Sequence, residues 1–162
     1  MFPPAEDMVV VEAVRRRFDP LAHVIPAHIT LVFPFESEIS ARALRKHVES
    51  ALIGVGPLQL GLGEVNVTDD QYLVFNVGHG AAAVADLHDR LYTGPLRQFL
   101  AADRAYLPHL TVGRLNTIAE ARRALEAIAS SNPRVDTIVS AVSVYRTGPN
   151  QGRAIEFEVP LA

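Results

Sequence analysis

The stretch Pro26-Ala27-His28-Ile29-Thr30-Leu31-Val32-Phe33-Pro34-Phe35 decides how this chain folds and where its polar chemistry lies. It places an imidazole and a hydroxyl two residues apart inside an apolar run. A second copy, Leu107-Pro108-His109-Leu110-Thr111-Val112, repeats that order just after a proline. Residues i and i+2 of a strand project to the same face. Each copy therefore predicts a strand that presents one imidazole and one hydroxyl together, while its apolar residues point into the core: Ile29, Leu31, Leu110 and Val112.

The two motifs together are stronger evidence than either motif alone. A single histidine in an apolar strand is more often a buried, hydrogen-bonded residue than a catalytic one. At average composition, however, about 0.1 or fewer matches to this pattern are expected by chance in a chain of this size. Polar groups in an apolar strand need partners or a function, so the repetition favours one site shared by both copies.

Composition indicates a single globular domain, residues 1–162, with a sizeable core. The chain contains no cysteine, which excludes disulfides, thiol nucleophiles and thiolate zinc sites. A cytoplasmic location is the simplest expectation. Neither a secretory leader nor an apolar run long enough to span a bilayer is present, so no membrane association is expected. The net charge of −3 argues against bulk electrostatic binding of long nucleic acid but allows a small anionic ligand.

The hydrophobic periodicity predicts helices and strands in an order that repeats. The first half is predicted to contain a strand at 8–14, a loop at 18–27, the first motif strand, a helix from 40 to 54, and a hairpin of strands 58–67 and 72–77. The rest is predicted to contain a helix at 81–92, a break at Gly94-Pro95 before 96–101, the second motif strand, a helix at 118–130, and strands at 135–145 and 153–159 around a turn at 147–150.

This repetition predicts an α+β fold. Each motif strand is followed by a loop, a helix and a hairpin, which is typical of a duplicated, pseudo-symmetric αβ unit. We therefore expect two lobes, with antiparallel sheets around a central cleft and helices outside. The two motif strands should line the cleft, which is the candidate site.

Two histidines on opposite sides of a cleft suit acid–base chemistry at phosphorus. Imidazole titrates near neutrality, so one ring can act as base and the other as acid at a single pH. Hydroxyls on the same walls can donate hydrogen bonds to non-bridging phosphoryl oxygens. No metal or other cofactor is expected, because two histidines without a neighbouring carboxylate motif are too few ligands. The nucleophile elbow and the Rossmann and P-loop fingerprints are absent.

At these residues the sequence resembles the two-histidine (2H) phosphoesterase superfamily, and within it the LigT-like RNA 2′,3′-cyclic phosphodiesterases, also called 2′-5′ RNA ligases. The signature of that superfamily is two His-h-Thr/Ser-h motifs, where h is apolar. His28-Ile29-Thr30-Leu31 and His109-Leu110-Thr111-Val112 match it with a typical separation, and the resemblance extends over nearly the whole chain.

This resemblance implies that His28 and His109 are the catalytic pair and that Thr30 and Thr111 bind phosphate. It also implies a nucleotide or an RNA 3′ end with a cyclic phosphate as the partner, and no obligatory protein partner is evident. Members of the superfamily act on RNA ends, small cyclic nucleotides, ADP-ribose cyclic phosphate and tRNA-splicing intermediates, so the motifs leave the substrate open.

Further candidates for substrate binding surround the motifs. Arg114 stands where LigT-like members often carry an arginine, although strand parity counted from His109 turns it away from the cleft. The other candidates are a possible stacking wall at Phe35, the strand-end pair Tyr145 and Arg146, and the rim residue Tyr106. Phe33 is predicted to lie in the core.

The arginine triplet and the histidines outside the motifs are expected to lie mainly at the surface. The triplet Arg15-Arg16-Arg17 forms either a solvated turn or a phosphate-facing edge. The remaining four histidines are predicted to lie on the surface: His23, His47, His79 and His88.

Three functions are consistent with these residues and with the resemblance. The leading hypothesis is a metal-independent phosphodiesterase that hydrolyses a 2′,3′-cyclic phosphate or a related diester. The alternatives are a reversible 2′-5′ RNA ligase and a non-catalytic module that binds RNA ends or nucleotides. Which histidine acts as base depends on the direction in which the substrate lies.

Overall fold

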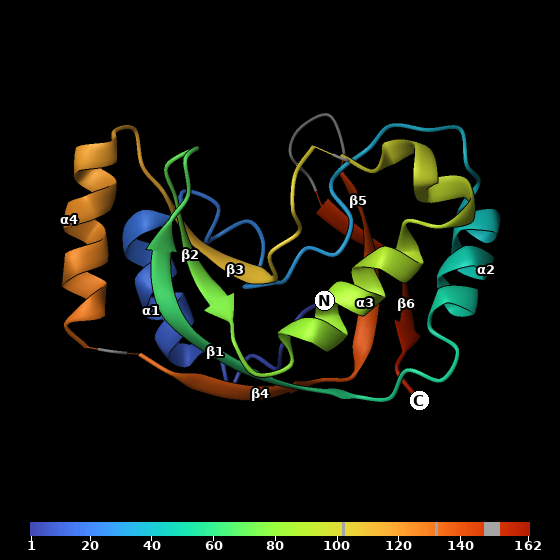
Figure 1. The fold of residues 1–162 in the computed structure, drawn as a ribbon, viewed down its shortest axis with the longest axis horizontal. Coiled ribbons are helices and arrows are strands. Elements are labelled where there is room, and N and C mark those ends of the chain that lie inside the picture. The colour runs from blue at the N-terminus through green and yellow to red at the C-terminus, as the bar shows by residue number, and fades with distance from the viewer. Residues whose placement is uncertain (102, 132, 148–152) are drawn as a thin grey trace.

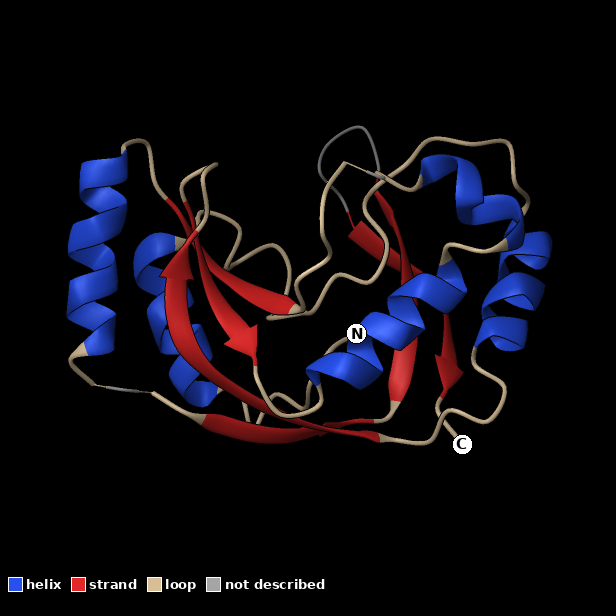
Figure 2. Cartoon of the chain, in the orientation of Figure 1, coloured by secondary structure: helices blue, strands red, loops and turns tan. Residues whose placement is uncertain are grey.

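The computed structural model describes residues 1–101, 103–131, 133–147 and 153–162, and it has two lobes (Figure 1). A four-stranded antiparallel sheet forms the first lobe, in the order β3-β2-β1-β4. Helices α1 and α4 cover one face of this sheet (Figure 2). The bounds are α1 Val9–Phe18, β1 Leu58–Val67, β2 Tyr72–Val77, β3 His109–Arg114, α4 Ile118–Ala129 and β4 Val135–Val139.

The second lobe is built on the antiparallel pair β5 (Ala141–Thr147) and β6 (Arg153–Pro160). Around this pair lie α2 (Ala41–Ala51), α3 (Ala81–Leu91) and the 3₁₀ helix η1 (Gly94–Phe99). The α+β class, the antiparallel sheets and the outer helices confirm the predicted fold class.

Elements with local start and stop signals lie where the sequence predicts them. Ser40 caps α2 by accepting a hydrogen bond from Ala43 N–H, and Thr117 caps α4 in a reciprocal capping box with Glu120. The β1–β2 hairpin has the predicted bounds. Thr68 Oγ1 stabilises its turn by accepting from Tyr72 N–H at 3.1 Å.

The first element is a helix, so the strand predicted at 8–14 is wrong. Val11 and Arg15 are buried four residues apart on one side of α1, whereas Val9 and Val10 are exposed. This side packs on β3 at Gly113, where a Cβ atom would lie 2.8 Å from Phe18 Cβ. Packing of a helical face therefore outweighs the strand preference of the Val9-Val10-Val11 run.

Two other predicted strands differ from the structure. The strand predicted at 135–145 is divided at Ser140, because β4 pairs with β1 whereas β5 pairs with β6. The first motif forms only an isolated antiparallel bridge, between Ile29 and Leu110. The turn predicted at 147–150 lies outside the described residues, apart from Thr147 at the end of β5.

The apolar residues of both motifs lie in the main core, as predicted. Ile29, Leu31, Leu110 and Val112 are each at most 5% exposed, in one cluster with Leu73 and Phe75 of β2. The motif backbones are thus anchored from the core side. Among the described residues, no helix is long and apolar enough to cross a membrane.

Arg15 is a buried structural residue. For this position, both interpretations of the arginine triplet, a solvated turn and a phosphate-facing edge, are therefore wrong. Its guanidinium is paired with Glu12 and Asp19, each at 2.8 Å, and donates to Ile25 O at 2.8 Å. Glu12 in turn accepts from Ala27 N–H at 2.7 Å. Arg16 and Arg17 are exposed. The Arg15 network therefore holds the loop that leads into His28.

Replacement of Arg15 by methionine should lower the free energy of unfolding by about 3 kcal/mol, because it leaves two carboxylates and a carbonyl without their donor. Urea denaturation would measure this as a lower midpoint with an unchanged slope. Arg16→Met is the matched control and should stay within about 0.5 kcal/mol of the parent. Equal effects of both substitutions would contradict the structural role of Arg15.

Candidate active site

The bridge between Ile29 and Leu110 sets the geometry of the four motif side chains. Because the two segments are antiparallel there, His28 lies opposite Thr111 and Thr30 lies opposite His109. All four side chains project to the face opposite the buried Ile29 and Leu110. The histidines occupy a diagonal, for which residues on neighbouring strands usually lie about 7–8 Å apart, with the Cβ atoms somewhat closer. The bridge therefore brings the two motifs side by side, and the alternation of buried and partly exposed residues puts their imidazoles and hydroxyls on one face.

Both imidazoles are oriented by the same backbone contact. His28 Nδ1 lies 2.9 Å from Pro26 O, and His109 Nδ1 lies 2.6 Å from Leu107 O. A carbonyl oxygen only accepts hydrogen bonds, so Nδ1 carries the proton in each neutral ring. Nε2 is then the atom on each histidine that can take up or release a proton, which is what a catalytic acid or base requires.

Met1 forms the outer neighbour of the first motif. Ile29 N–H donates to Met1 O at 2.9 Å, and the Met1 amine donates to Ile29 O at 2.9 Å. Burial lowers the pKa of this amine to about 5, against the opposing effect of the Glu158 charge. The amine is therefore a neutral donor at neutral pH, and the backbone of Ile29 is held on this side too.

Phe2 joins His28 to the second lobe. The centroid of its ring lies 5.4 Å from that of His28 and 5.1 Å from that of Tyr145 on β5. Tyr145, a sequence candidate, is thus on the His28 side of the site. Sequence reasoning missed Phe2, since a phenylalanine near the start of the chain has no distinguishing pattern.

Arg114 shares a face with His109 and Thr111, contrary to the parity count. The partners of these three residues on β2 are Tyr72, Asn76 and Val74, and a bulge in the register between Leu73 and Val74 shifts the alternation by one residue. Arg114 nevertheless lies far from His109, because their partners on β2 are Tyr72 and Asn76, four residues or about 13 Å apart along the strand. Its guanidinium stacks on Tyr72 at 5.4 Å. It therefore lies on the same face as His109 and Thr111, but near the other end of β3 from His109.

Asn76 is a neighbour of His109 that the sequence analysis missed. It pairs directly with His109 and is half-buried. Its side-chain amide has no hydrogen-bond partner in the part of the chain that the structure describes. The signal was available, because asparagine is unfavourable inside a strand, but its position beside His109 follows only from the register.

The other sequence candidates are engaged elsewhere. Phe35 stacks on Phe99 with ring centroids 4.5 Å apart, and Arg146 forms a two-bond ion pair with Glu156. Phe33 is 43% exposed, so its predicted core position is wrong. Tyr106 is half-buried beneath the first motif and donates to Thr30 O at 2.8 Å.

The four remaining histidines divide into different environments. His23 and His79 are exposed, as predicted. His88 is buried, so its predicted surface position is wrong, and its Nδ1 lies 2.7 Å from Leu31 O. His47 is half-buried, and its Nε2 lies 2.8 Å from Leu91 O.

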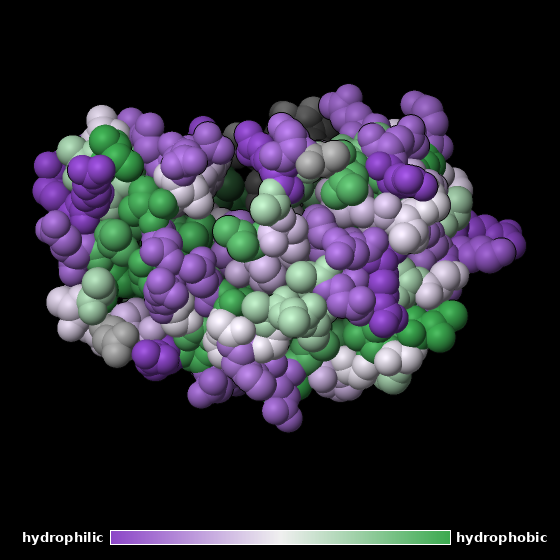
Figure 3. All heavy atoms as spheres, viewed as in Figure 1, coloured by the Kyte–Doolittle hydropathy of each residue, from purple (hydrophilic) through white to green (hydrophobic). Residues whose placement is uncertain are grey.

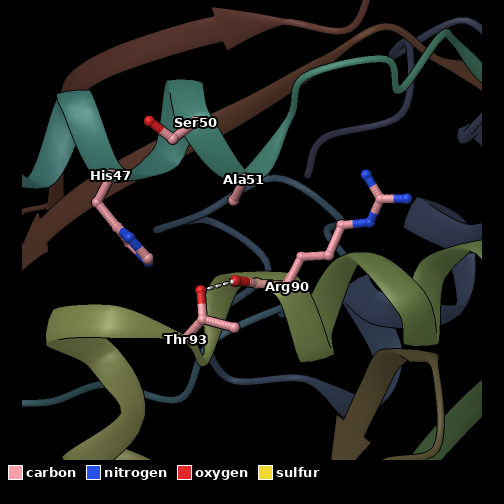
Figure 4. A pocket seen from close by; sticks show the side chains of 5 residues that line it. All are labelled: His47, Ser50, Ala51, Arg90 and Thr93. Atoms are coloured by element: carbon pink, nitrogen blue, oxygen red, sulfur yellow. Dashed lines mark hydrogen bonds between the residues drawn. The ribbon is translucent and has the colours of Figure 1, made fainter.

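The molecular surface is hollowed between the two lobes in the space-filling view (Figure 3). A separate hollow of about 320 Å³ lies between α2 and the end of α3, where His47, Ser50, Ala51, Arg90 and Thr93 line it (Figure 4). Its polar groups are already engaged, since Arg90 pairs with Asp86 and Thr93 donates to Arg90 O. In the described ranges, no group of three or more histidine and carboxylate side chains is arranged to hold a metal ion.

Fold and site together define a two-lobed α+β protein with paired His-x-Thr motifs at its centre. A model of the 2′-5′ RNA ligase superfamily matches residues 2–151, so the chain belongs to that superfamily, which is the 2H phosphoesterase group. A Halalkalibacterium halodurans protein is 31% identical over 119 residues, which is 70% of this chain and 67% of the relative. A Bacillus licheniformis protein is 25% identical over 116 residues, covering 70% and 68%. Both carry the name "putative phosphoesterase".

The hydrogen bonds predict opposite tautomers for different histidines. Neutral His28, His109 and His88 should carry the proton on Nδ1, whereas neutral His47 should carry it on Nε2, because in each case the partner is a carbonyl. Long-range ¹H–¹⁵N NMR of the rings at alkaline pH would show this pattern, with His47 as the internal contrast. An Nε2–H tautomer at His28 or His109 would contradict the arrangement of the site.

Proposed function

We propose that this chain is a metal-independent phosphodiesterase that hydrolyses a 2′,3′-cyclic phosphate, or a related nucleotide or RNA-end diester, by paired histidine catalysis. The observation that supports the proposal is the antiparallel bridge between Ile29 and Leu110, around which we expect His28 and His109 on one diagonal and Thr30 and Thr111 on the other. Membership of the superfamily and the phosphoesterase names of the relatives support phosphoesterase activity in general.

In the proposed reaction, a water molecule attacks phosphorus opposite the departing ribose oxygen. Nε2 of one histidine removes a proton from the water as the new P–O bond forms. The bond between phosphorus and the 2′ or 3′ oxygen breaks, and Nε2 of the other histidine protonates that oxygen. The products are a phosphomonoester and a free hydroxyl. The starting protonation state returns when the first ring releases its extra proton to solvent and the second ring takes one up.

The threonines and the aromatic side chains supply binding. Hydroxyl donors at Thr30 and Thr111 would stabilise the negative charge that develops on the non-bridging oxygens. The rings of Phe2 and Tyr145 beside His28 offer an apolar surface on which a nucleobase could stack. Asn76, next to His109, would contact the substrate on the other side.

Substitution of either motif histidine by alanine should reduce hydrolysis of 2′,3′-cyclic nucleotides and of a cyclic-phosphate-ended oligonucleotide by about 10²–10⁴-fold, because each step needs its own proton carrier. Initial rates should be measured in a chelator. His79→Ala is the matched control, since His79 is exposed outside the site, and it should keep the rate of the parent.

Each other outcome of this assay identifies an alternative. Turnover that survives both His28→Ala and His109→Ala would overturn the mechanism. Activity lost only in chelator would indicate a metal. Binding without turnover by the parent chain would favour a nucleotide-binding module, and joining of oligonucleotide ends would favour ligation.

The dependence of kcat/KM on pH should be bell-shaped for the parent enzyme. At low pH the base is protonated and cannot accept the proton of water, and at high pH the acid has lost the proton that the leaving oxygen needs. Rates measured between about pH 5 and 8 would show both limbs if two imidazoles titrate. A flat profile over that range would count against the paired mechanism.

A further inference from the structure

The first motif lacks the strand pairing that holds the second. His109 and Thr111 lie in β3, which is hydrogen-bonded along β2. Thr30, by contrast, is followed by residues without a sheet partner among the described strands. Buried backbone groups outside a sheet need other partners. The backbone that carries His28 and Thr30 must therefore be held by groups outside the sheet.

Three aromatic side chains provide those partners. Tyr106 Oη donates to Thr30 O at 2.8 Å, His88 Nδ1 donates to Leu31 O at 2.7 Å, and Tyr92 Oη accepts from Phe33 N–H at 3.0 Å. They therefore bind consecutive parts of the segment that follows His28. Figure 1 shows α3, which carries His88, beside this segment.

The three rings also hold one another. His88 stacks on Tyr106 with centroids 3.8 Å apart and an interplanar angle of 5°, and it meets Tyr92 edge-on at 4.7 Å. His88 and Tyr92 are each 4% exposed and lie four residues apart, on one side of the end of α3. Aromatic side chains have few rotatable bonds, so this cluster fixes its polar atoms with little freedom.

The hydroxyl of Tyr106 keeps its proton. Burial, reinforced by the neighbouring Tyr92, raises the pKa of Tyr106 above its ordinary value. Tyr106 therefore remains a donor to Thr30 O throughout the pH range in which imidazoles titrate.

We propose that Tyr106, His88 and Tyr92 are positioning residues for the first motif: they hold the backbone of residues 30–33 so that Thr30 and His28 face His109. This inference rests on the proposed function for its consequence on rate. None of the three side chains needs to touch the substrate. They act through Thr30, in the same way that the β2 ladder acts on Thr111. Errors of about 1 Å in the placement of a catalytic group can reduce rates by about 10²-fold.

The main test is a double-mutant cycle with Tyr106→Phe and Thr30→Ala. Tyr106→Phe removes one oxygen and should lower kcat about tenfold or more, with KM for a 2′,3′-cyclic nucleotide changed less than about threefold. In the Thr30→Ala background, the same change should lower kcat by a clearly smaller factor, because the Thr30 hydroxyl that it positions is absent and only the placement of His28 is still disturbed. Equal effects in both backgrounds would overturn the proposal.

A matched control separates positioning from stability. Thr137 on β4 is 5% exposed, and its hydroxyl donates to Asp7 at 2.7 Å, outside the site. Thr137→Val should lower the melting temperature at least as much as Tyr106→Phe does, without changing kcat. A fall in kcat for Thr137→Val as large as that for Tyr106→Phe would assign both effects to general stability and overturn the proposal.

Rescue at His88 provides a second variant. The side-chain amide of His88→Asn can replace Nδ1 as donor to Leu31 O, whereas His88→Leu cannot. The asparagine variant should therefore keep a higher kcat than the leucine variant at equal folded fraction. The reverse order would contradict positioning by this hydrogen bond.

Hydrogen exchange distinguishes failure of this proposal from failure of the proposed function. If the parent chain does not hydrolyse any cyclic phosphate, the proposed function fails, but the positioning role can still be measured. Exchange of the amides of residues 30–33 should then be faster in Tyr106→Phe and Tyr92→Phe than in Thr137→Val. Unchanged exchange would overturn the positioning role independently of activity.

Discussion

The structure depends on side-chain hydrogen bonds to the backbone of residues 25–33, where a strand ladder would be expected. Arg15 binds Ile25 O and Glu12 binds Ala27 N–H before His28, and Tyr106 and His88 bind the carbonyls that follow it. Met1 occupies both backbone groups of Ile29 between these two sets. Unsatisfied polar groups would be costly at this depth. These partners therefore allow an irregular segment to carry half of the site.

The two halves of the internal repeat are thus more alike at the two motifs than in the elements that support the motifs. Both histidines bind a carbonyl two residues upstream through Nδ1, and the two motifs meet symmetrically about the bridge of Ile29 and Leu110. The supports differ, because the second motif belongs to a four-stranded sheet and the first is held by aromatic and charged side chains. Similar local geometry at the histidines has been reached with different partners for the surrounding backbone.

Local signals in the sequence predicted most elements, and long-range contacts account for the errors. The helix caps at Ser40 and Thr117 and the β1–β2 turn are encoded by neighbouring residues, so their bounds were predictable. Nothing near Val9 signals that its helix packs on Gly113, and nothing near His88 signals a partner at Leu31, 57 residues away. The meeting of the two motifs was predictable from their repetition. The face of Arg114 was not, because it depends on a bulge in the pairing with β2.

The chain has a net charge of −3, so the groups that would stabilise the negative charge of a phosphodiester must be identified around the site itself. Arg146 is paired with Glu156, and Arg114 lies about 13 Å along the sheet from His109. In the part of the chain that the structure describes, the groups found beside the two histidines are neutral hydroxyls, an amide and aromatic rings. Under the proposed reaction, stabilisation of the phosphoryl oxygens then comes from oriented donors and from the protonated imidazole, rather than from a cluster of fixed cations. Such donors stabilise charge only when they are held in place, so the supports of Thr30 and Thr111 matter as much as the hydroxyls themselves.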